Sequence, residues 1–230
     1  MCNSIGVEQY FHKQLFFKKQ KAVTINKGHD VSWYSNYPPA EIKKELGLAD
    51  DTFLLINVAN NRKMKGIPYL MKTISMLPKN KNIHLLLAGR GMKTNKNLSI
   101  LKNAGYEDRV HFLGFRKDVL NIVSACDVFV LSSLFGESIT KSVIEAMSLQ
   151  KPAVITDIPG NIELIENGEN GFVTPVKNSK AMAQAIVYMF DNPEETKEMG
   201  IKAKAKIENK LNSKQTVLKL MALYEKLTND

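Results

Sequence analysis

Short apolar runs without polar alternation recur along the chain, separated by stretches that have helical periodicity. Runs rich in Val, Ile and Leu are typical of strands that are covered on both faces, as in parallel sheets. Their regular alternation with amphipathic segments predicts an α/β fold with a doubly wound parallel sheet. The expected strands are residues 22–26, 53–59, 83–88, 110–113, 128–131, 153–156 and 171–174.

The segments between these runs have the apolar spacing of helices. The expected helices are residues 7–17, 40–46, 67–77, 98–104, 117–124, 140–149, 161–167, 179–190, 193–208 and 214–227. Turn residues agree with this order, because Pro159-Gly160 precedes one expected helix and Pro193 begins another. Right-handed crossovers would place the functional loops at the carboxyl ends of the strands.

The first expected helix carries an aromatic face with Phe11, Phe16 and Phe17, and a lysine-rich segment at 18–21 follows it. Two interpretations are open. The phenylalanines pack on a protein core, or the helix lies on a membrane surface. The first is favoured, with the core belonging to a partner domain.

Composition narrows the classes of partner. Lys and Arg number 32 against 23 Asp and Glu, which gives a formal net charge of +9. We rank an anionic membrane surface first, an anionic ligand second and nucleic acid last, since no nucleic-acid-binding motif is present. Cys2 and Cys126 have no disulfide-framework or zinc-site spacing, which favours a cytoplasmic protein. No apolar run approaches the length of a membrane span.

The most informative stretch lies between an expected strand and the helix at 140–149. Glu137 follows a glycine turn, and Glu145 lies eight residues further on, inside the helix. Free amides at a helix N-terminus bind phosphate groups, and carboxylates accept hydrogen bonds from sugar hydroxyls. A glutamate early in a helix is also favourable to the helix dipole, which explains Glu145 without a ligand but does not explain Glu137. The pair therefore points toward a nucleotide-sugar.

Three other loops end expected strands. Arg62 and Lys65 precede Gly66 and could clamp a diphosphate, although a solvated basic loop is an equal alternative. Gly89 begins a Gly-x-Gly turn that would allow close approach of the backbone to a ligand. Phe115 and Arg116 follow a further glycine turn, where they could lie over a flat base, or the segment is an ordinary strand–turn–helix connection.

Taken in order, these motifs resemble one family over nearly the whole chain. They are Lys65-Gly66, the Ala-Gly-Arg-Gly turn at 88–91, the Phe-Leu-Gly-Phe turn at 112–115, the Glu-x7-Glu segment with Ala146-Met147, and the Asn-Gly-x-x-Gly segment at 167–171. The set resembles the C-terminal, donor-binding half of retaining glycosyltransferases of the GT-B fold, family 4 (group 1). The resemblance implies a Rossmann-like domain.

The resemblance also implies residue roles. Glu145 would bind the ribose, Glu137 would face the donor sugar, and Lys65 would neutralise the diphosphate. The backbone amides of Ile139, Thr140 and Lys141 would hold the diphosphate, and the backbone around Phe115 and Arg116 would hold the base. The nucleotide-sugar would be a substrate, with no metal or other cofactor, and leaving-group charge would be stabilised by fixed cations and amides.

Two positions depart from the family pattern. The family usually has an arginine where this chain has Asn60, so Arg62 is the nearest candidate to replace it. The residue after the first glutamate is commonly glycine, and here it is Ser138.

The resemblance divides the chain into three parts. Residues 1–21 correspond to the end of an N-terminal acceptor domain, 22–208 to the nucleotide-sugar-binding domain, and 209–230 to a helix that packs back on the acceptor domain. The complete enzyme would transfer a hexose-type sugar to a glycan or lipid-linked acceptor in polysaccharide or lipopolysaccharide biosynthesis. Peripheral contact with an anionic membrane at its inner face is also expected.

Other interpretations remain open. The chain could be a truncated or split-subunit fragment that binds nucleotide-sugar without transferring it alone. A nucleotide-sugar epimerase of the same fold is a third interpretation, and the Glu-x7-Glu segment favours the transferases over it. Nucleic-acid binding is the most distant alternative.

Overall fold

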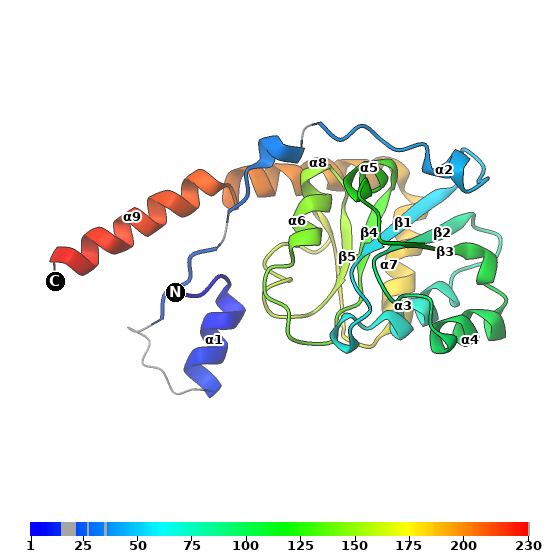
Figure 1. The fold of residues 1–230 in the computed structure, drawn as a ribbon, viewed down its shortest axis with the longest axis horizontal. Helices are drawn as coiled ribbons and strands as arrows, with labels where there is room; N and C mark the ends of the chain where they lie inside the picture. The colour runs from blue at the N-terminus through cyan, green and yellow to red at the C-terminus, as the bar shows by residue number, and fades with distance from the viewer. Residues whose placement is uncertain (15–21, 27, 35, 230) are drawn as a thin grey trace.

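The protein is described here by a computed structural model that covers residues 1–14, 22–26, 28–34 and 36–229. Six parallel strands form one sheet in the order β3-β2-β1-β4-β5-β6 (Figure 1). The strands are β1 (Phe53–Val58), β2 (Ile83–Ala88), β3 (Val110–Gly114), β4 (Val128–Leu131), β5 (Ala153–Thr156) and β6 (Gly171–Thr174). The predicted Rossmann-like α/β fold is therefore confirmed.

Helices cover both faces of this sheet, as the apolar strands require. One face is packed against α3 (Ile67–Ile74), α4 (Asn95–Ala104) and α7 (Ser179–Asp191). The other is packed against α2 (Ile42–Glu45), α5 (Val119–Ala125), α6 (Lys141–Ser148) and α8 (Pro193–Lys210). Consecutive strand residues serve opposite layers, since Leu85 lies in the first apolar cluster and Leu86 in the second.

The strand order reverses direction at the centre of the sheet. The chain runs outward from β1 to β3, then returns to place β4 beside β1. The crevice outside the carboxyl ends of the strands at such a reversal is the usual ligand site of open α/β sheets. The loops after β1 and β4 meet there, and they carry Lys65 and Glu137.

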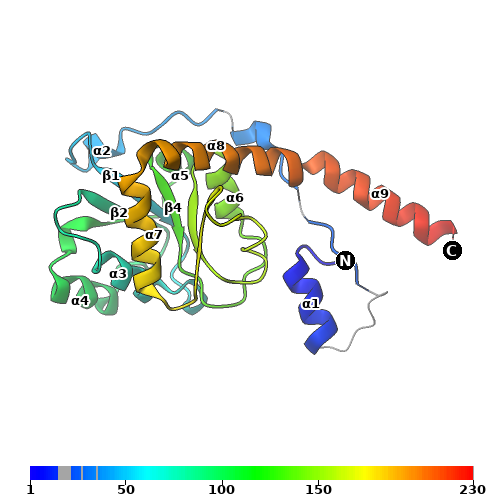
Figure 2. The same cartoon turned by 180° about the vertical axis from the view of Figure 1, so that it is seen from behind.

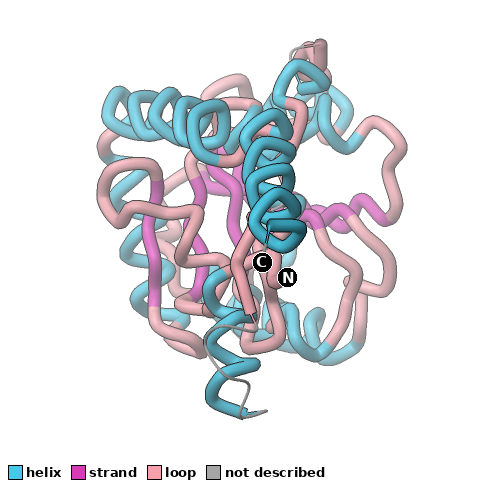
Figure 3. The backbone as a smooth tube through the Cα atoms, turned by 90° about the vertical axis from the view of Figure 1, so that its left-hand side faces the viewer, coloured by secondary structure: helices cyan, strands magenta, loops and turns pink. Residues whose placement is uncertain are grey.

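The two ends of the chain extend from the same end of this body (Figures 1 and 2). α1 (Ile5–Gln14), η2 (Val31–Tyr34) and α9 (Ser213–Asn229) lie at this end, and α9 projects away from the sheet (Figures 1 and 2). Figure 3 views the molecule from this end, with the helix that ends at the C-terminus in front. One face of α9 exposes large apolar side chains: Val217, Leu218, Met221, Tyr224 and Leu227. None of the described helices combines the length and apolarity needed to cross a membrane.

Two expected elements are wrong. Residues 22–26 do not join the sheet. Instead, Thr24 forms an isolated bridge with Cys2 at the N-terminal end. Residues 161–167 form turns instead of a helix, and Gly160, with φ of 95°, diverts the backbone just before them. The first helix ends at Gln14 within the described residues, so Phe16, Phe17 and the lysine-rich segment at 18–21 lie outside them.

Candidate functional site

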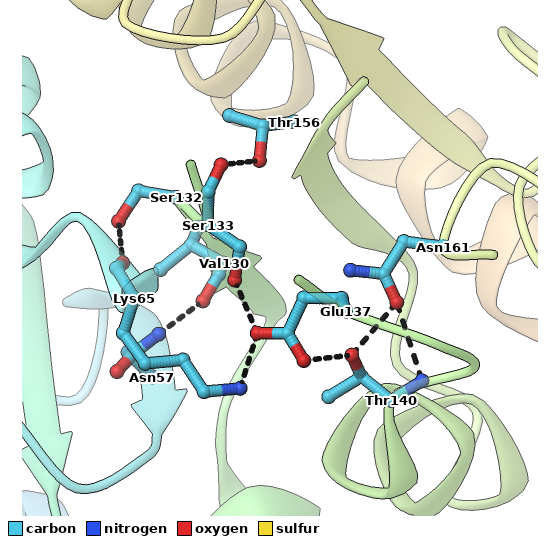
Figure 4. Close-up of polar contacts among 9 residues, drawn as sticks. All are labelled: Asn57, Lys65, Val130, Ser132, Ser133, Glu137, Thr140, Thr156 and Asn161. Carbon is cyan, nitrogen blue, oxygen red and sulfur yellow. Dashed lines mark hydrogen bonds and ion pairs between the residues drawn. The ribbon is translucent and has the colours of Figure 1, made fainter. Parts of the chain in front are cut away.

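Glu137 is held by side chains from its own loop, after β4, and from the loop after β1 (Figure 4). Lys65 Nζ lies 2.6 Å from Glu137 Oε1, and Ser133 Oγ donates to the same oxygen at 2.7 Å. Thr140 Oγ1 lies 3.1 Å from Glu137 Oε2. The pair is largely covered, since the side chain of Glu137 is 9% exposed and that of Lys65 is 15% exposed. Both charged groups are therefore fixed in position before any ligand arrives.

The loop that carries Lys65 is joined to the β4 loop through its backbone. Lys65 ends the short 3₁₀ helix η3 (Lys63–Lys65), and Gly66 follows it with φ of 62°. A Cβ on Gly66 would lie 2.1 Å from the carbonyl oxygen of Ser132, so only glycine permits this approach. The hydroxyl of Ser132 donates to the carbonyl of Lys65 at 3.0 Å. The Lys-Gly pair in the sequence thus positions the lysine across the switch point.

A buried asparagine supports the start of α6 from outside. Asn161 Oδ1 accepts from the amide of Thr140 at 3.2 Å and lies 2.7 Å from Thr140 Oγ1 (Figure 4). Its turn approaches closely, because a Cβ on Gly160 would lie 2.8 Å from the carbonyl carbon of Ser138. The sequence analysis assigned neither Asn161 nor Ser133 to the site. The Pro159-Gly160 pair was the available signal for Asn161, and it was misinterpreted as a helix start.

The first turn of α6 presents backbone donors at the same place. In the described part of the chain, the amides of Ile139, Lys141 and Ser142 have no hydrogen-bond partner, whereas that of Thr140 is bound to Asn161. Unpaired amides at a helix N-terminus form an anion-binding position. Two of the three predicted amides are thus open to a ligand, and the third is engaged by a side chain.

Glu145 lies on the next turn of α6 and has a different environment. Its Oε1 is 3.1 Å from Nζ of Lys141, whose side chain is 72% exposed, and this hydrogen bond raises the pKa of Lys141. Burial and the nearby Glu145 carboxylate raise the pKa of Tyr34 in η2. A hollow of about 540 Å³ adjoins this face, lined by Trp33, Tyr34 and Lys141 among others.

A second hollow, of about 430 Å³, lies beyond the ends of β1, β2 and β3. Gly89 forms its floor with φ of 143°, and a Cβ there would overlap the carbonyl oxygen of Ala59. The exposed ring of Phe115 forms one wall, with the guanidinium of Arg90 5.2 Å from its centroid. A flat apolar wall beside a close backbone suits a planar ring.

Arg116 lines the same hollow, but its guanidinium is paired. It forms two hydrogen bonds to Glu45, at 2.6 and 3.0 Å, and two to Asp118, both at 2.8 Å. These bonds raise the pKa of Arg116 and lower the pKa of both carboxyls. The side chain therefore braces the wall of the hollow, which leaves the backbone for contact with a ligand.

The predicted site residues thus fall into separate groups. Lys65, Glu137 and Thr140 are brought together, and Gly89, Phe115 and Arg116 share the second hollow. Arg62 lines a third hollow on the other side of its loop. At the position of the missing family arginine, the carboxamide of Asn60 accepts from the amide of Arg90 at 3.0 Å. Among the described residues, no cluster of three or more His, Cys, Asp or Glu is arranged to hold a metal ion.

Comparisons with known proteins identify the family and the fold. The family model described as "Glycosyl transferases group 1" matches residues 39–206. The chain is 27% identical over 201 residues to N-acetyl-alpha-D-glucosaminyl L-malate synthase of Bacillus anthracis, covering 87% of this chain and 52% of that protein. It is 26% identical over 224 residues to UDP-Gal:alpha-D-GlcNAc-diphosphoundecaprenol alpha-1,3-galactosyltransferase of Escherichia coli, covering 92% and 56%.

A solved structure shows the same fold. The crystal structure of Anabaena Alr3699/HepE in complex with UDP superposes with a TM-score of 0.89 at 24% identity, over 98% of this chain and 63% of that one. The chain spans about half the length of the curated relatives it matches, at 52% and 56% of the two named here.

Proposed function

The chain belongs to the group 1 glycosyl transferases, and from that membership we propose that it forms the donor-binding half of a sugar transferase. It would hold a nucleoside diphosphate sugar for transfer to a glycan or lipid-linked acceptor, with retention of configuration. The observation that carries this proposal is the covered Lys65–Glu137 pair beside the open amides of α6, at the point where the strand order reverses.

In the proposed arrangement, each end of the donor meets a matching group. The base lies in the hollow beside Phe115, against the backbone at Gly89 and Arg116. Glu145 accepts hydrogen bonds from the ribose once Lys141 swings away. The Glu137 carboxylate faces the sugar hydroxyls, in a hollow of about 860 Å³ that Glu137 lines together with Phe135 and Ser138.

The diphosphate lies between these ends. Lys65 and the amides of Ile139 and Lys141 neutralise the charge that develops on the leaving group, without a metal ion or other cofactor. Preorganised donors of this kind need no rearrangement during the reaction. Arg62 would contribute from the neighbouring position if its side chain turned toward the diphosphate.

The proposed transfer also requires a domain that binds the acceptor on the other side of the donor site. Acceptor binding and transfer would depend on an N-terminal acceptor domain that packs against the exposed apolar face of α9 and the α1 region. Binding and transfer are therefore expected to separate. The described chain would bind nucleotide-sugar, while transfer would need the acceptor domain.

The test is a calorimetric titration of the 230-residue chain with UDP, GDP, ADP and their glucose conjugates. One nucleotide should bind, and Lys65→Ala should weaken it, whereas Lys102→Ala on the far end of α4 should not. A chain that binds none of these nucleotides would refute the donor assignment. Robust sugar transfer by the chain alone would refute the need for an acceptor domain.

We also propose peripheral contact with an anionic membrane, which the net charge of +9 supports. Co-sedimentation with vesicles containing phosphatidylglycerol, and its loss at high salt, would test this contact. Binding that is insensitive to salt would contradict it.

A further inference from the structure

A third hollow, of about 690 Å³, lies beside the Glu137 site. The η3 loop and the first turns of α3 and α4 form one side, and Phe135 and Lys177 form the other. Phe135 and Lys177 also line the hollow that contains Glu137, so the two hollows adjoin. We call the third hollow the cationic groove.

The charges around the cationic groove all have one sign. Five cationic side chains and no Asp or Glu line it: Arg62, Lys63, Lys72, Lys96 and Lys177. Within the described ranges, none of the five forms an ion pair. Elsewhere on the surface some cations have carboxylate partners, as Lys202 has in Glu169, so the distinctive feature of the groove is that five unpaired cations line one hollow. A cluster of unpaired like charges is unfavourable without a counter-charge, so the groove is electrostatically suited to an anion.

Two helix ends at the cationic groove have the same preference, and a buried polar atom and aromatic rings offer other contacts to a ligand. The N-termini of α3 and α4 both border it, and each adds partial positive charge. Asn97, which is buried, also lines it, and its Oδ1 has no hydrogen-bond partner among the described residues. A hydroxyl on a bound ligand would satisfy that oxygen. Tyr69 and Phe135 add aromatic surface.

We propose that the cationic groove binds a phosphate or diphosphate group of a second ligand, distinct from the nucleotide donor. Its volume falls within the range of about 300–1,000 Å³ that is usual for small-molecule sites, which favours a discrete group over a flat membrane surface. Several lysines directed at one hollow match a multiply charged anion better than a single carboxylate. The adjoining Glu137 site places such a ligand next to the proposed donor sugar.

The cationic groove is independent of the proposed donor site, because the donor site does not include its four lysines: Lys63, Lys72, Lys96 and Lys177. The test is a calorimetric titration of the 230-residue chain with inorganic pyrophosphate, in two backgrounds. In one, saturating UDP fills the donor site. In the other, Lys65→Ala weakens the donor site without nucleotide. If UDP fails to bind, the donor assignment fails, and the second background still reports on the groove.

The test variant is the double charge reversal Lys63→Glu/Lys96→Glu. The matched control is Lys102→Glu/Lys219→Glu, which makes the same change in net charge on α4 and α9. We expect the test variant to weaken pyrophosphate binding about tenfold, as the loss of several short-range charge contacts implies. The control should change it less than twofold, because charges beyond about 8 Å are screened at physiological salt.

Weaker pyrophosphate binding by Lys63→Glu/Lys96→Glu is not expected to come from misfolding. Lys96→Glu places an acidic residue in the first turn of α4, where it favours the helix dipole. UDP affinity within twofold of the wild type would show an intact fold. If UDP does not bind, an unchanged urea-unfolding midpoint gives the same control. Pyrophosphate affinity that stays within twofold in the test variant, or falls equally in the control, would overturn the proposal.

The source of the phosphate is resolved by a second titration with farnesyl diphosphate. Tighter binding than pyrophosphate would indicate a lipid-borne diphosphate whose chain contacts Tyr69 or Phe135, and equal binding a free phosphorylated ligand. Both outcomes support the groove. A different outcome is binding to vesicles that Lys63→Glu/Lys96→Glu abolishes and that added pyrophosphate does not inhibit. This outcome would assign the groove to a membrane surface and overturn the proposal.

Discussion

Glu137 and Glu145 belong to one sequence segment and both are mostly covered, yet their lysine partners differ: Lys65 is 15% exposed and Lys141 is 72% exposed. Glu137 is bound by Ser133 and Thr140 from its own loop and by Lys65 from the loop after β1, and it is almost fully covered. Glu145 has one charged neighbour, the exposed Lys141 on its own helix. The first carboxylate is fixed by tertiary structure, and the second is held by a local contact that a ligand can displace.

This difference between the two glutamates predicts that Glu137 contributes mainly to folding stability and Glu145 mainly to ligand binding. A covered charge that loses its partner leaves the other charge uncompensated, so Glu137 should matter strongly to folding. The side chain of Glu145 is 15% exposed, but its partner Lys141 is 72% exposed, and a pair with one solvated partner contributes little to folding. Glu145 should therefore matter mainly when a nucleotide is present. Four predictions test this contrast.

The largest effect is expected from Glu137→Gln, which keeps the shape of the side chain but leaves the Lys65 ammonium without its counter-charge. We expect the free energy of unfolding to fall by about 3 kcal/mol, the lower end of the cost of breaking a buried pair. Urea denaturation at neutral pH measures it. In the double variant Lys65→Met/Glu137→Gln, part of the loss should be recovered. Strict additivity of the two single changes would show that the pair is not coupled.

The next effect is on ligand affinity. Glu145→Ala should weaken nucleotide binding by roughly 1.5–3 kcal/mol, as expected for hydrogen bonds to a charged group. Lys141→Ala should change it by less, because that residue is assigned to the diphosphate through its backbone and its side chain only covers Glu145. Calorimetric titration with the nucleotide that binds measures both. Equal losses in the two variants would contradict the ribose assignment.

The third prediction concerns the link between Glu137 and α6. Thr140→Val keeps the side-chain volume but removes the hydroxyl that lies within reach of both Glu137 and Asn161. The variant should lose about 1 kcal/mol of unfolding free energy, the usual net contribution of a hydrogen bond. Thr140→Ser, which retains the hydroxyl, is the matched control and should lose less. If both variants unfold at the same urea concentration, the hydroxyl has no structural role.

Periodicity alone predicted all six sheet strands, because β1 to β6 are covered on both faces and their sequences are continuously apolar. It failed at residues 161–167, where apolar spacing suggested a helix but Gly160 adopts a left-handed φ that the spacing does not encode. It also failed at residues 22–26, because a β-like run carries no information about which strand it pairs with.

The site was partly predictable for the same reason. Gly66 and Glu137 lie in the loops after β1 and β4, which are neighbouring strands, so topology alone brings these loops together. The contact of Asn161 with Thr140 depends on the path of a turn distant in sequence, and no local pattern predicts it. Ser133 is close to Glu137 in sequence, but the spacing does not indicate that its hydroxyl donates to that carboxylate. The ion pair of Arg116 with Glu45 was equally hidden, since Glu45 is 71 residues away.

The smallest predicted effect is the effect of Glu145→Gln on stability. The pair with Lys141 is a single i,i+4 contact on a helix, and the lysine is mostly exposed, so its loss should cost only about 0.4 kcal/mol. Urea denaturation beside Glu137→Gln, which changes the same side chain in the same way, isolates the effect of environment. A loss for Glu145→Gln comparable to that for Glu137→Gln would mean that Glu145, whose side chain is 15% exposed, behaves as a buried charge. The contrast between the two glutamates would then be one of geometry and not of energy.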